Sequence, residues 1–247
     1  WDFHGDRDAH FKAIDLLRYS LEYDSSFAYP YSQIASRYFT LYHRNVLENA
    51  NYLDSVIFYA DRALYYDNQL SEAYGLRGEY FRAKGQKRRA LNAFDKAIEI
   101  NPNGYQAYQS KGWLYFGTND ILESIMNFHK AVQLDRGDNH ANGLRALGRA
   151  YNNAGFSEKY MEILDEVLAL DGDTVQYYTQ LCLTYNSACN YHAAIESAHK
   201  VYQRDTTDTG ILGNLVLSYF GSRQFHKALT YCDRYLDIME DLDLIYY

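Results

Sequence analysis

The chain has 247 residues, of which 47% are hydrophobic and 23% are charged, so it is a folded protein and not a disordered one. Its 24 basic and 32 acidic residues give a formal net charge of −8, which makes general binding to nucleic acid or to an anionic membrane unfavourable. No apolar run approaches the roughly 18 residues needed to cross a bilayer. We therefore expect neither nucleic acid nor a membrane among its partners.

The ends of the chain and its cysteines give further expectations. The sequence runs from Trp1 to Tyr247 without a basic and then apolar leader, and we expect it to be a segment of a longer or a processed protein. This pattern favours a cytoplasmic location, although an address signal outside the segment would decide the compartment. Cys182, Cys189 and Cys232 lack the close spacing of a disulfide framework, and we expect them to be small buried hydrophobic residues.

The first quarter of the chain predicts irregular helical units. A helical stripe covers residues 6–24, and a second helix is predicted from Phe27 to His43. Residues 43–52 are polar and predict an insertion before a partner helix from Leu53 to Tyr66. This gives a partial repeat over residues 1–24 and a divergent repeat with an insertion over residues 25–68.

From Ser71 onwards the pattern becomes regular. Residues 71–104 contain two short helical patterns around a turn at Lys84-Gly85-Gln86, and Asn101-Pro102-Asn103 closes the unit. The same plan returns roughly every 34 residues, which is typical of a helical repeat array. Repeats are assigned to residues 71–104, 105–138, 141–174, 175–208 and 209–241.

Small residues recur at fixed places in this unit. If Ser71 is position 1, Gly78 is position 8, Ala90 is position 20 and Ala97 is position 27. Small side chains at these places let helix axes approach to about 8 Å, and large residues such as Phe94 fill the space around them. This spacing resembles the tetratricopeptide repeat. The resemblance implies an all-α fold, a right-handed α-α superhelix (TPR solenoid) of about 13 helices that spans residues 1–247 as one solenoid.

The resemblance also implies where a partner binds. In this family the first helix of each repeat lines a concave groove for peptides, and positions 2, 5, 9, 12 and 13 face that groove. Aromatic and Arg side chains often anchor protein interfaces, and side-chain amides bond to peptide backbones. The predicted groove residues are Arg82, Gln109, Trp113, Phe116, Arg145, Arg149, Asn152 and Asn186. We expect an acidic or carboxylate-bearing segment with an apolar anchor; the alternative is that the aromatic residues pack internally and the Arg side chains are solvated.

The sequence contains no recognisable catalytic or metal-binding motif. HExxH and CxxC spacings are absent, and His192 and His199 are seven residues apart on one predicted helix. We therefore predict no catalytic residues, no metal and no cofactor. A basic cluster is interpreted as a solvated turn, with an acidic partner or nucleic acid as the alternative. It comprises Arg77, Arg82, Lys84, Lys87, Arg88 and Arg89.

These observations predict a non-catalytic scaffold or adaptor that binds a protein or peptide. One alternative is a sensory or regulatory segment of a larger bacterial signalling or transcription regulator; an enzyme or a small-molecule binder is another. An uncapped last repeat leaves an apolar face bare, which predicts self-association through the C-terminal end. The residues of that face are Val216, Leu217, Phe220, Leu236 and Ile238.

Overall fold

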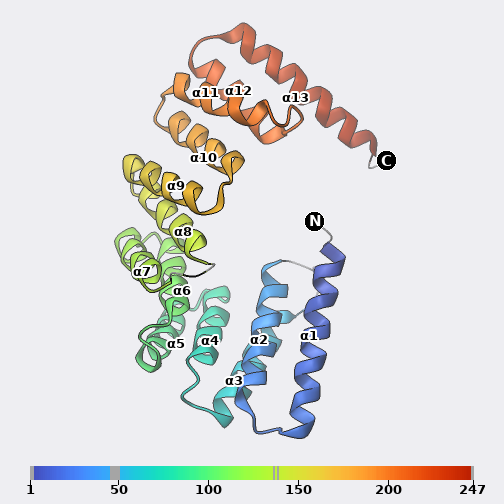
Figure 1. Ribbon diagram of the computed structural model, residues 1–247, viewed down its shortest axis with the longest axis vertical. Helices are drawn as coiled ribbons and strands as arrows, with labels where there is room; N and C mark the ends of the chain where they lie inside the picture. Colours follow the sequence, from blue (N-terminus) through green and yellow to red (C-terminus); the bar gives the residue numbers. More distant parts are fainter. Residues whose placement is uncertain (1–2, 45–50, 136, 138, 246–247) are drawn as a thin grey trace. The chain divides into compact units, whose positions relative to one another are not determined.

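The computed structural model describes residues 3–44, 51–135, 137 and 139–245. Within these ranges the chain forms 13 α-helices joined by short connections, and no β-strand occurs among them (Figure 1). The predicted all-α fold of about 13 helices is therefore confirmed.

The chain divides after Gly143 into two compact units, which we call unit 1 and unit 2. Unit 1 holds α1 to α7 and the first turn of α8, and unit 2 holds the rest of α8 and α9 to α13. The helices are α1 (Phe3–Tyr23), α2 (Ala28–His43), α3 (Tyr52–Tyr66), α4 (Ser71–Ala83), α5 (Lys87–Ile100), α6 (Tyr105–Gly117), α7 (Ile121–Leu134), α8 (His140–Asn153), α9 (Ser157–Asp171), α10 (Thr174–Ser187), α11 (Tyr191–Tyr202), α12 (Thr209–Gly221) and α13 (Phe225–Ile245).

Consecutive helices pack in pairs within each unit. In unit 1, α2 contacts α3, α4 contacts α5 and α6 contacts α7; in unit 2, α10 contacts α11 and α12 contacts α13. The first helices of successive pairs are also in contact: α2 with α4, α4 with α6, and α10 with α12. Apolar side chains are buried in several small clusters, such as those around Phe94 and Leu215, as expected for units that pack only on their neighbours.

Glycine at position 8 allows the helices of a pair to cross closely. A methyl group on Gly78 would overlap the ring of Phe94, and one on Gly112 would lie 2.5 Å from the ring of Phe128. Both rings are fully buried. At both glycines the aromatic residue of position 24 therefore supplies the nearest atoms. Position 20 also contacts position 8 in the second of these repeats, where the Ser124 hydroxyl donates a 3.0 Å hydrogen bond to the Gly112 carbonyl.

The turn between the helices of a pair has the same conformation in five successive places. In each of them the second residue after the first helix has a positive φ, between 57° and 85°. The next N–H donates to the carbonyl five residues earlier, for example Gln86 to Phe81 at 2.8 Å. This is the hydrogen bond of a helix-ending Schellman turn. The positive-φ residues are Gly85, Asn119, Gly155, Cys189 and Arg223. Because side chains disfavour this conformation, the three non-glycine turns are strained.

Three expectations need comment. All three cysteines are free, but the expectation that they are buried holds only for Cys182, because Cys189 lies in an exposed turn beyond the end of α10 and Cys232 is half-buried. The last helix extends beyond residue 241, where the last predicted repeat ends, and continues to Ile245. Most of the predicted insertion over residues 43–52 lies outside the described residues.

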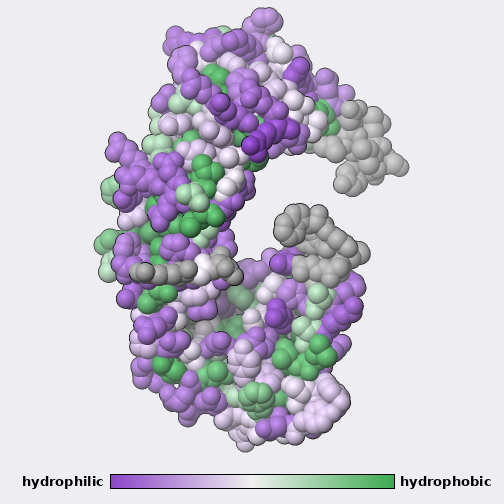
Figure 2. Space-filling view, viewed as in Figure 1, coloured by the Kyte–Doolittle hydropathy of each residue, from purple (hydrophilic) through white to green (hydrophobic). Residues whose placement is uncertain are grey.

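The surface is mostly hydrophilic, with separate apolar groups. Figure 2 shows hydrophobic residues scattered among hydrophilic ones on the visible face. None of the described helices is both long enough and apolar enough to cross a membrane.

Candidate functional site

The first helices of unit 1 form an open groove. Its volume is about 410 Å³, and its lining comes mainly from α2, α4 and α6, together with one residue of α5 and the connection before α6. Phe39 of α2 and Leu76 of α4 provide apolar wall, while Gln33, Gln106 and Ser110 provide polar side chains. We call this the unit 1 groove. It is a cleft between successive repeats, which is the place where an extended segment of another chain can lie against several helices at once.

Two carboxylates line the unit 1 groove, and Arg and Lys are absent from its described lining. Glu79 is buried; its Oε2 accepts a 2.7 Å bond from Arg82, and its Oε1 accepts a 2.5 Å bond from the Ser110 hydroxyl. Glu72 is exposed and accepts only a 3.2 Å bond from Gln33 and a 3.5 Å contact from Ser32. Glu79 is thus used within the protein, whereas Glu72 retains most of its capacity to accept hydrogen bonds.

Arg82, predicted as a groove cation, is held by its neighbours. Besides the ion pair with Glu79, its guanidinium lies 3.4 Å from Nε2 of His43. Burial lowers the pKa of His43, and the Arg82 charge lowers it further, while Glu79 opposes the shift. The Arg82 charge is therefore balanced inside the unit, and the groove beside it is acidic.

The predicted aromatic pair lies on α6. The rings of Trp113 and Phe116 meet edge to face with centroids 5.7 Å apart, and Trp113 also packs edge to face on the buried ring of Phe128 at 5.0 Å. Both Trp113 and Phe116 are half-buried, as is Gln109 on the same helix. Part of each ring supports the core, and the rest remains available to a partner. None of these three residues lines the unit 1 groove.

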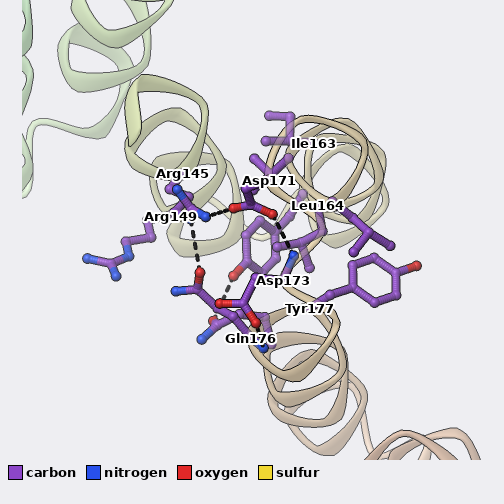
Figure 3. A pocket seen from close by; sticks show the side chains of 12 residues that line it. Arg145, Arg149, Ile163, Leu164, Asp171, Asp173, Gln176 and Tyr177 are labelled. Carbon is purple, nitrogen blue, oxygen red and sulfur yellow. Dashed lines mark hydrogen bonds and ion pairs between the residues drawn. The ribbon is translucent and has the colours of Figure 1, made fainter. Parts of the chain in front are cut away.

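In unit 2, Arg145 is enclosed by a polar cluster (Figure 3). Its Nε donates a 3.0 Å hydrogen bond to Oε1 of Gln176 on α10, and its guanidinium forms an ion pair with Asp171 at the end of α9. Both charged side chains are about three-quarters buried, with 23% and 25% of their surfaces exposed. The neighbouring cavity is small, about 20 Å³, and the aromatic ring of Tyr177 lies on its wall. Arg145 therefore joins three helices of unit 2.

The other predicted residues of unit 2 differ in availability. Arg149 is exposed, and its side chain extends away from the Arg145 cluster in Figure 3. Asn152 is exposed near the end of α8. Asn186 is half-buried, because its Oδ1 accepts a 2.8 Å bond from the Ser218 hydroxyl on α12 and its Nδ2 lies 3.7 Å from the sulfur of Cys182. Arg149 and Asn152 are thus presented to solvent, whereas Asn186 connects two first helices.

The predicted site residues divide equally between the units. Arg82, Gln109, Trp113 and Phe116 belong to unit 1, and Arg145, Arg149, Asn152 and Asn186 belong to unit 2. We therefore treat them as two surfaces.

Sequence reasoning missed most of the unit 1 groove. Glu72 and Glu79 are at positions 2 and 9 of the repeat that starts at Ser71, but their charge is opposite to that of Arg82 on the same helix, so the sequence pattern there is mixed in sign. Phe39 was missed because it belongs to the divergent unit before the regular repeats, where no register could be assigned. The available signal was the pair of carboxylates on one face of α4, seven residues apart.

A polar link between consecutive first helices recurs at a nearly constant spacing. Glu79 binds Ser110, Arg145 binds Gln176, and Asn186 binds Ser218, at separations of 31, 31 and 32 residues. Each bond joins one repeat to the next on the face of the first helices. Several residues that looked like ligand contacts therefore hold the array together.

The described residues contain no group of three or more His, Cys, Asp or Glu side chains placed to hold a metal ion. Consecutive helix pairs, tight crossings at small residues and repeated turns define a helical-repeat protein. Models of the tetratricopeptide repeat match residues 71–103 and 105–138. The chain therefore contains tetratricopeptide repeats within residues 71–138.

Known proteins share this fold at low identity. The TPR repeat-containing protein MJ1428 of Methanocaldococcus jannaschii is 24% identical over 240 residues, which cover 93% of this chain and 40% of that protein. The chain thus spans less than half the length of this relative. The crystal structure of MamA protein is 23% identical with a TM-score of 0.60, over 70% of this chain and 93% of MamA. That of YrrB, described as a TPR protein with an unusual peptide-binding site, is 19% identical with a TM-score of 0.57, over 74% of this chain and 93% of YrrB.

Proposed function

We propose that the chain is a non-catalytic scaffold that binds an extended segment of another protein in the unit 1 groove. Proteins of this family generally act as interaction scaffolds and not as enzymes. The observation that carries the proposal is the groove itself, about 410 Å³ in volume and lined by three successive first helices. A cleft of this size is in the range of ligand-binding sites, and its position allows contacts at several points along a segment.

The lining of the groove indicates the chemistry of the segment. Glu72 is exposed, and cationic side chains are missing from the described lining, so a Lys or Arg side chain of the ligand is attracted there. Phe39 and Leu76 suit a small or medium apolar side chain next to that cation. Gln33, Gln106 and Ser110 supply hydrogen bonds to an extended backbone. This surface favours a basic and apolar segment, in contrast to the acidic segment expected from the sequence.

A displayed library of random peptides, selected on the immobilised chain, tests this proposal. We expect the selected peptides to carry Lys or Arg beside an apolar residue. Fluorescence anisotropy with a selected peptide should show at least about a tenfold loss of affinity for Glu72→Lys, which corresponds to roughly 1.4 kcal/mol.

The matched control for that experiment is Glu123→Lys, an equal charge change at an exposed residue of α7 that does not line the groove. Equal losses for the two variants would show a general charge effect and reject the groove. Failure to select any binding peptide would count against a scaffold function in this unit.

The acidic segment predicted from the sequence is retained as a proposal for unit 2. Of the two Arg residues predicted there, Arg149 is exposed, with Asn152 beside it, while Arg145 is engaged by Asp171 and Gln176. For a peptide that carries two or more carboxylates, Arg149→Glu should reduce affinity more than Arg145→Gln. If the double variant Arg145→Glu with Arg149→Glu binds such a peptide as the wild type does, this surface has no such role.

Self-association through the C-terminal end is a further proposal for unit 2. Leu217, Phe220 and Leu236 are at least half exposed, with 53%, 62% and 50% of their surfaces accessible. Large apolar side chains that are exposed together often mark a surface that another protein chain covers. Sedimentation velocity over a hundredfold range of concentration should show a dimer that Leu236→Glu reduces; a monomer at every concentration would reject the proposal.

A further inference from the structure

A second cavity lies between α4 and α5, away from the unit 1 groove. Its volume is about 260 Å³. The groove residues Glu72, Leu76 and Glu79 lie on one face of α4, and the cavity residues Tyr74, Arg77 and Phe81 lie on the other. Because each residue of an α-helix advances by about 100°, the centres of these two sets are roughly 180° apart around α4. A ligand in this cavity would leave the groove free.

The cavity is lined by three cations. Arg77 comes from α4, and Arg89 and Lys96 come from α5; none of the lining residues described is acidic. Arg89 lies over the ring of Phe81, with its guanidinium carbon 4.0 Å from the ring centre. Stacking of this kind fixes the plane of the guanidinium, and only one of its N–H groups is used in the 2.8 Å bond to Gln86. Asn92 adds an exposed side-chain amide to the same lining.

Carboxylates outside the cavity balance two of these cations in part. Arg77 pairs with Asp61 at 3.2 Å and Lys96 with Glu99 at 2.9 Å, but the two carboxylates are 54% and 69% exposed, so water screens both pairs. The contact with Asp61 is made by the buried Nε of Arg77, so this part of the guanidinium already faces a carboxylate of α3.

The next repeat shows which cation is special to this cavity. Lys111 takes the place of Arg77 there and pairs with Asp95 at 2.7 Å. Arg77 pairs with Asp61 at the same residue spacing, so the cation at this position forms an ion pair with the preceding helix in both repeats. The residue in the place of Arg89, however, is Glu123, 34 residues later. The cation at the position of Arg77 and Lys111 therefore has a structural role in both repeats, whereas the positive charge of Arg89 distinguishes this repeat from the next one.

From this arrangement we infer that the cavity between α4 and α5 binds a phosphate monoester through Arg89, Lys96 and Asn92, with Arg77 behind them. A phosphate monoester carries a charge of about −1.5 to −2 at neutral pH, more than the single charge of each carboxylate with which it competes. Planar guanidinium groups match its oxygens in pairs. The site is independent of the proposed peptide groove, which lies on the other face of α4.

Isothermal titration calorimetry with N-acetyl-phosphoserine amide, and separately with inorganic phosphate, tests this inference on the whole chain. We expect saturable binding that Arg89→Glu reduces by about tenfold or more, because that substitution reverses one of the charges facing the ligand. Tighter binding of phosphoserine than of phosphate would indicate a phosphorylated protein segment, and equal binding would indicate a free phosphate; either result supports the site.

Two further variants keep the test decisive. Arg88→Glu is the matched control, because it makes the same charge change at an exposed residue next to Arg89 that does not line the cavity. Asn92→Asp adds a negative charge to the lining at an exposed position, so it should weaken binding even if Arg89→Glu disturbs the contact with Phe81. Equal effects of Arg88→Glu and Asn92→Asp would overturn the inference. So would the absence of saturation by either probe up to about 10 mM, because a dissociation constant of that size corresponds to a binding free energy of less than roughly 3 kcal/mol.

Discussion

Units 1 and 2 use the same helical scaffold but present different chemistry on their first helices. In unit 1 the groove is open, and Glu72 faces it with weak partners. In unit 2 the corresponding polar residues close on one another, as Arg145 does with Asp171 and Gln176. Apolar side chains such as Leu217 and Phe220 remain exposed there. The difference shows that the repeat fixes where side chains stand, while their neighbours decide whether they are available to a ligand.

The largest expected effect concerns the close helix crossing of unit 1. Gly78→Ala places a methyl group into the buried ring of Phe94, and we expect a loss of about 2 kcal/mol in the free energy of unfolding. In unit 2 the equivalent place is Gly148 in one repeat, where an added methyl group would lie 2.9 Å from the ring of Tyr160, but Cys182 in the next repeat, which does not depend on glycine. Urea denaturation followed by circular dichroism measures the change.

Gly75→Ala, three residues earlier on α4, is the control. A methyl group there meets no atom within 4 Å, so the substitution should stabilise the helix by up to about 1 kcal/mol. Equal destabilisation by the two substitutions would show that the ring contact at Gly78 is not the cause.

The closed cluster of unit 2 can be opened by Asp171→Asn. This substitution removes the charge that holds Arg145 but keeps an oxygen for the 2.9 Å bond from the Asp173 N–H. We expect affinity for an acidic peptide to increase by roughly threefold to fivefold, since the released Arg145 can form one solvent-accessible ion pair with the peptide, which contributes up to about 1 kcal/mol. Anisotropy with the acidic peptide measures the gain.

Asp165→Asn changes the charge of unit 2 by the same amount at a residue that accepts a 2.6 Å bond from the hydroxyl of Tyr177. That bond raises the pKa of Tyr177 to about 12. If Asp165→Asn increases affinity as much as Asp171→Asn does, the release of Arg145 is not the reason.

A smaller effect should distinguish the turns that have glycine at the positive-φ position from those that do not. Gly85 of unit 1 is a turn of the first kind, and Cys189 of unit 2, with a φ of 57°, is a turn of the second kind. Cys189→Gly removes the strain of a side chain in this conformation and should raise the free energy of unfolding by about 0.5–1 kcal/mol. Gly85→Ala should lower it by a similar amount, although a methyl group at Gly85 meets no atom within 4 Å. Changes of the same sign in the two variants would contradict this interpretation.

The smallest expected effect is a pH dependence of unit 2. Burial lowers the pKa of His199, and the charge of Lys227 lowers it further. Nε2 of His199 lies 2.8 Å from the Tyr219 hydroxyl, and its ring contacts the rings of Tyr202 and Tyr231 edge to face. The unfolded chain therefore takes up a proton on this residue at a higher pH than the folded chain does. The contribution of neutral His199 to the free energy of unfolding is fully present above the pKa of the unfolded chain, about 6.5. It is lost as the pH falls towards the lower pKa of the folded chain.

Thermal unfolding at neutral and at mildly acidic pH measures this dependence. His199→Gln should reduce the loss of stability in acid, whereas His192→Gln, an exposed residue on the same helix, should leave it unchanged. An unchanged acid response in His199→Gln would show that other groups cause it; His43 of unit 1 also has a pKa lowered by burial.

The sequence by itself determined the repeat, its register and the tight crossing at Gly78, because close helix packing requires small residues at regular intervals. It also placed Glu72, Glu79, Arg145 and Arg149 on the face of the first helices. Only the tertiary structure decided which of these are available, since Arg145 and Asp171 are 26 residues apart and meet only when three helices pack together. The groove beside Phe39 and the cavity beside Arg89 were likewise decided there, because a cavity is bounded by several helices at once and no local pattern encodes the space between them.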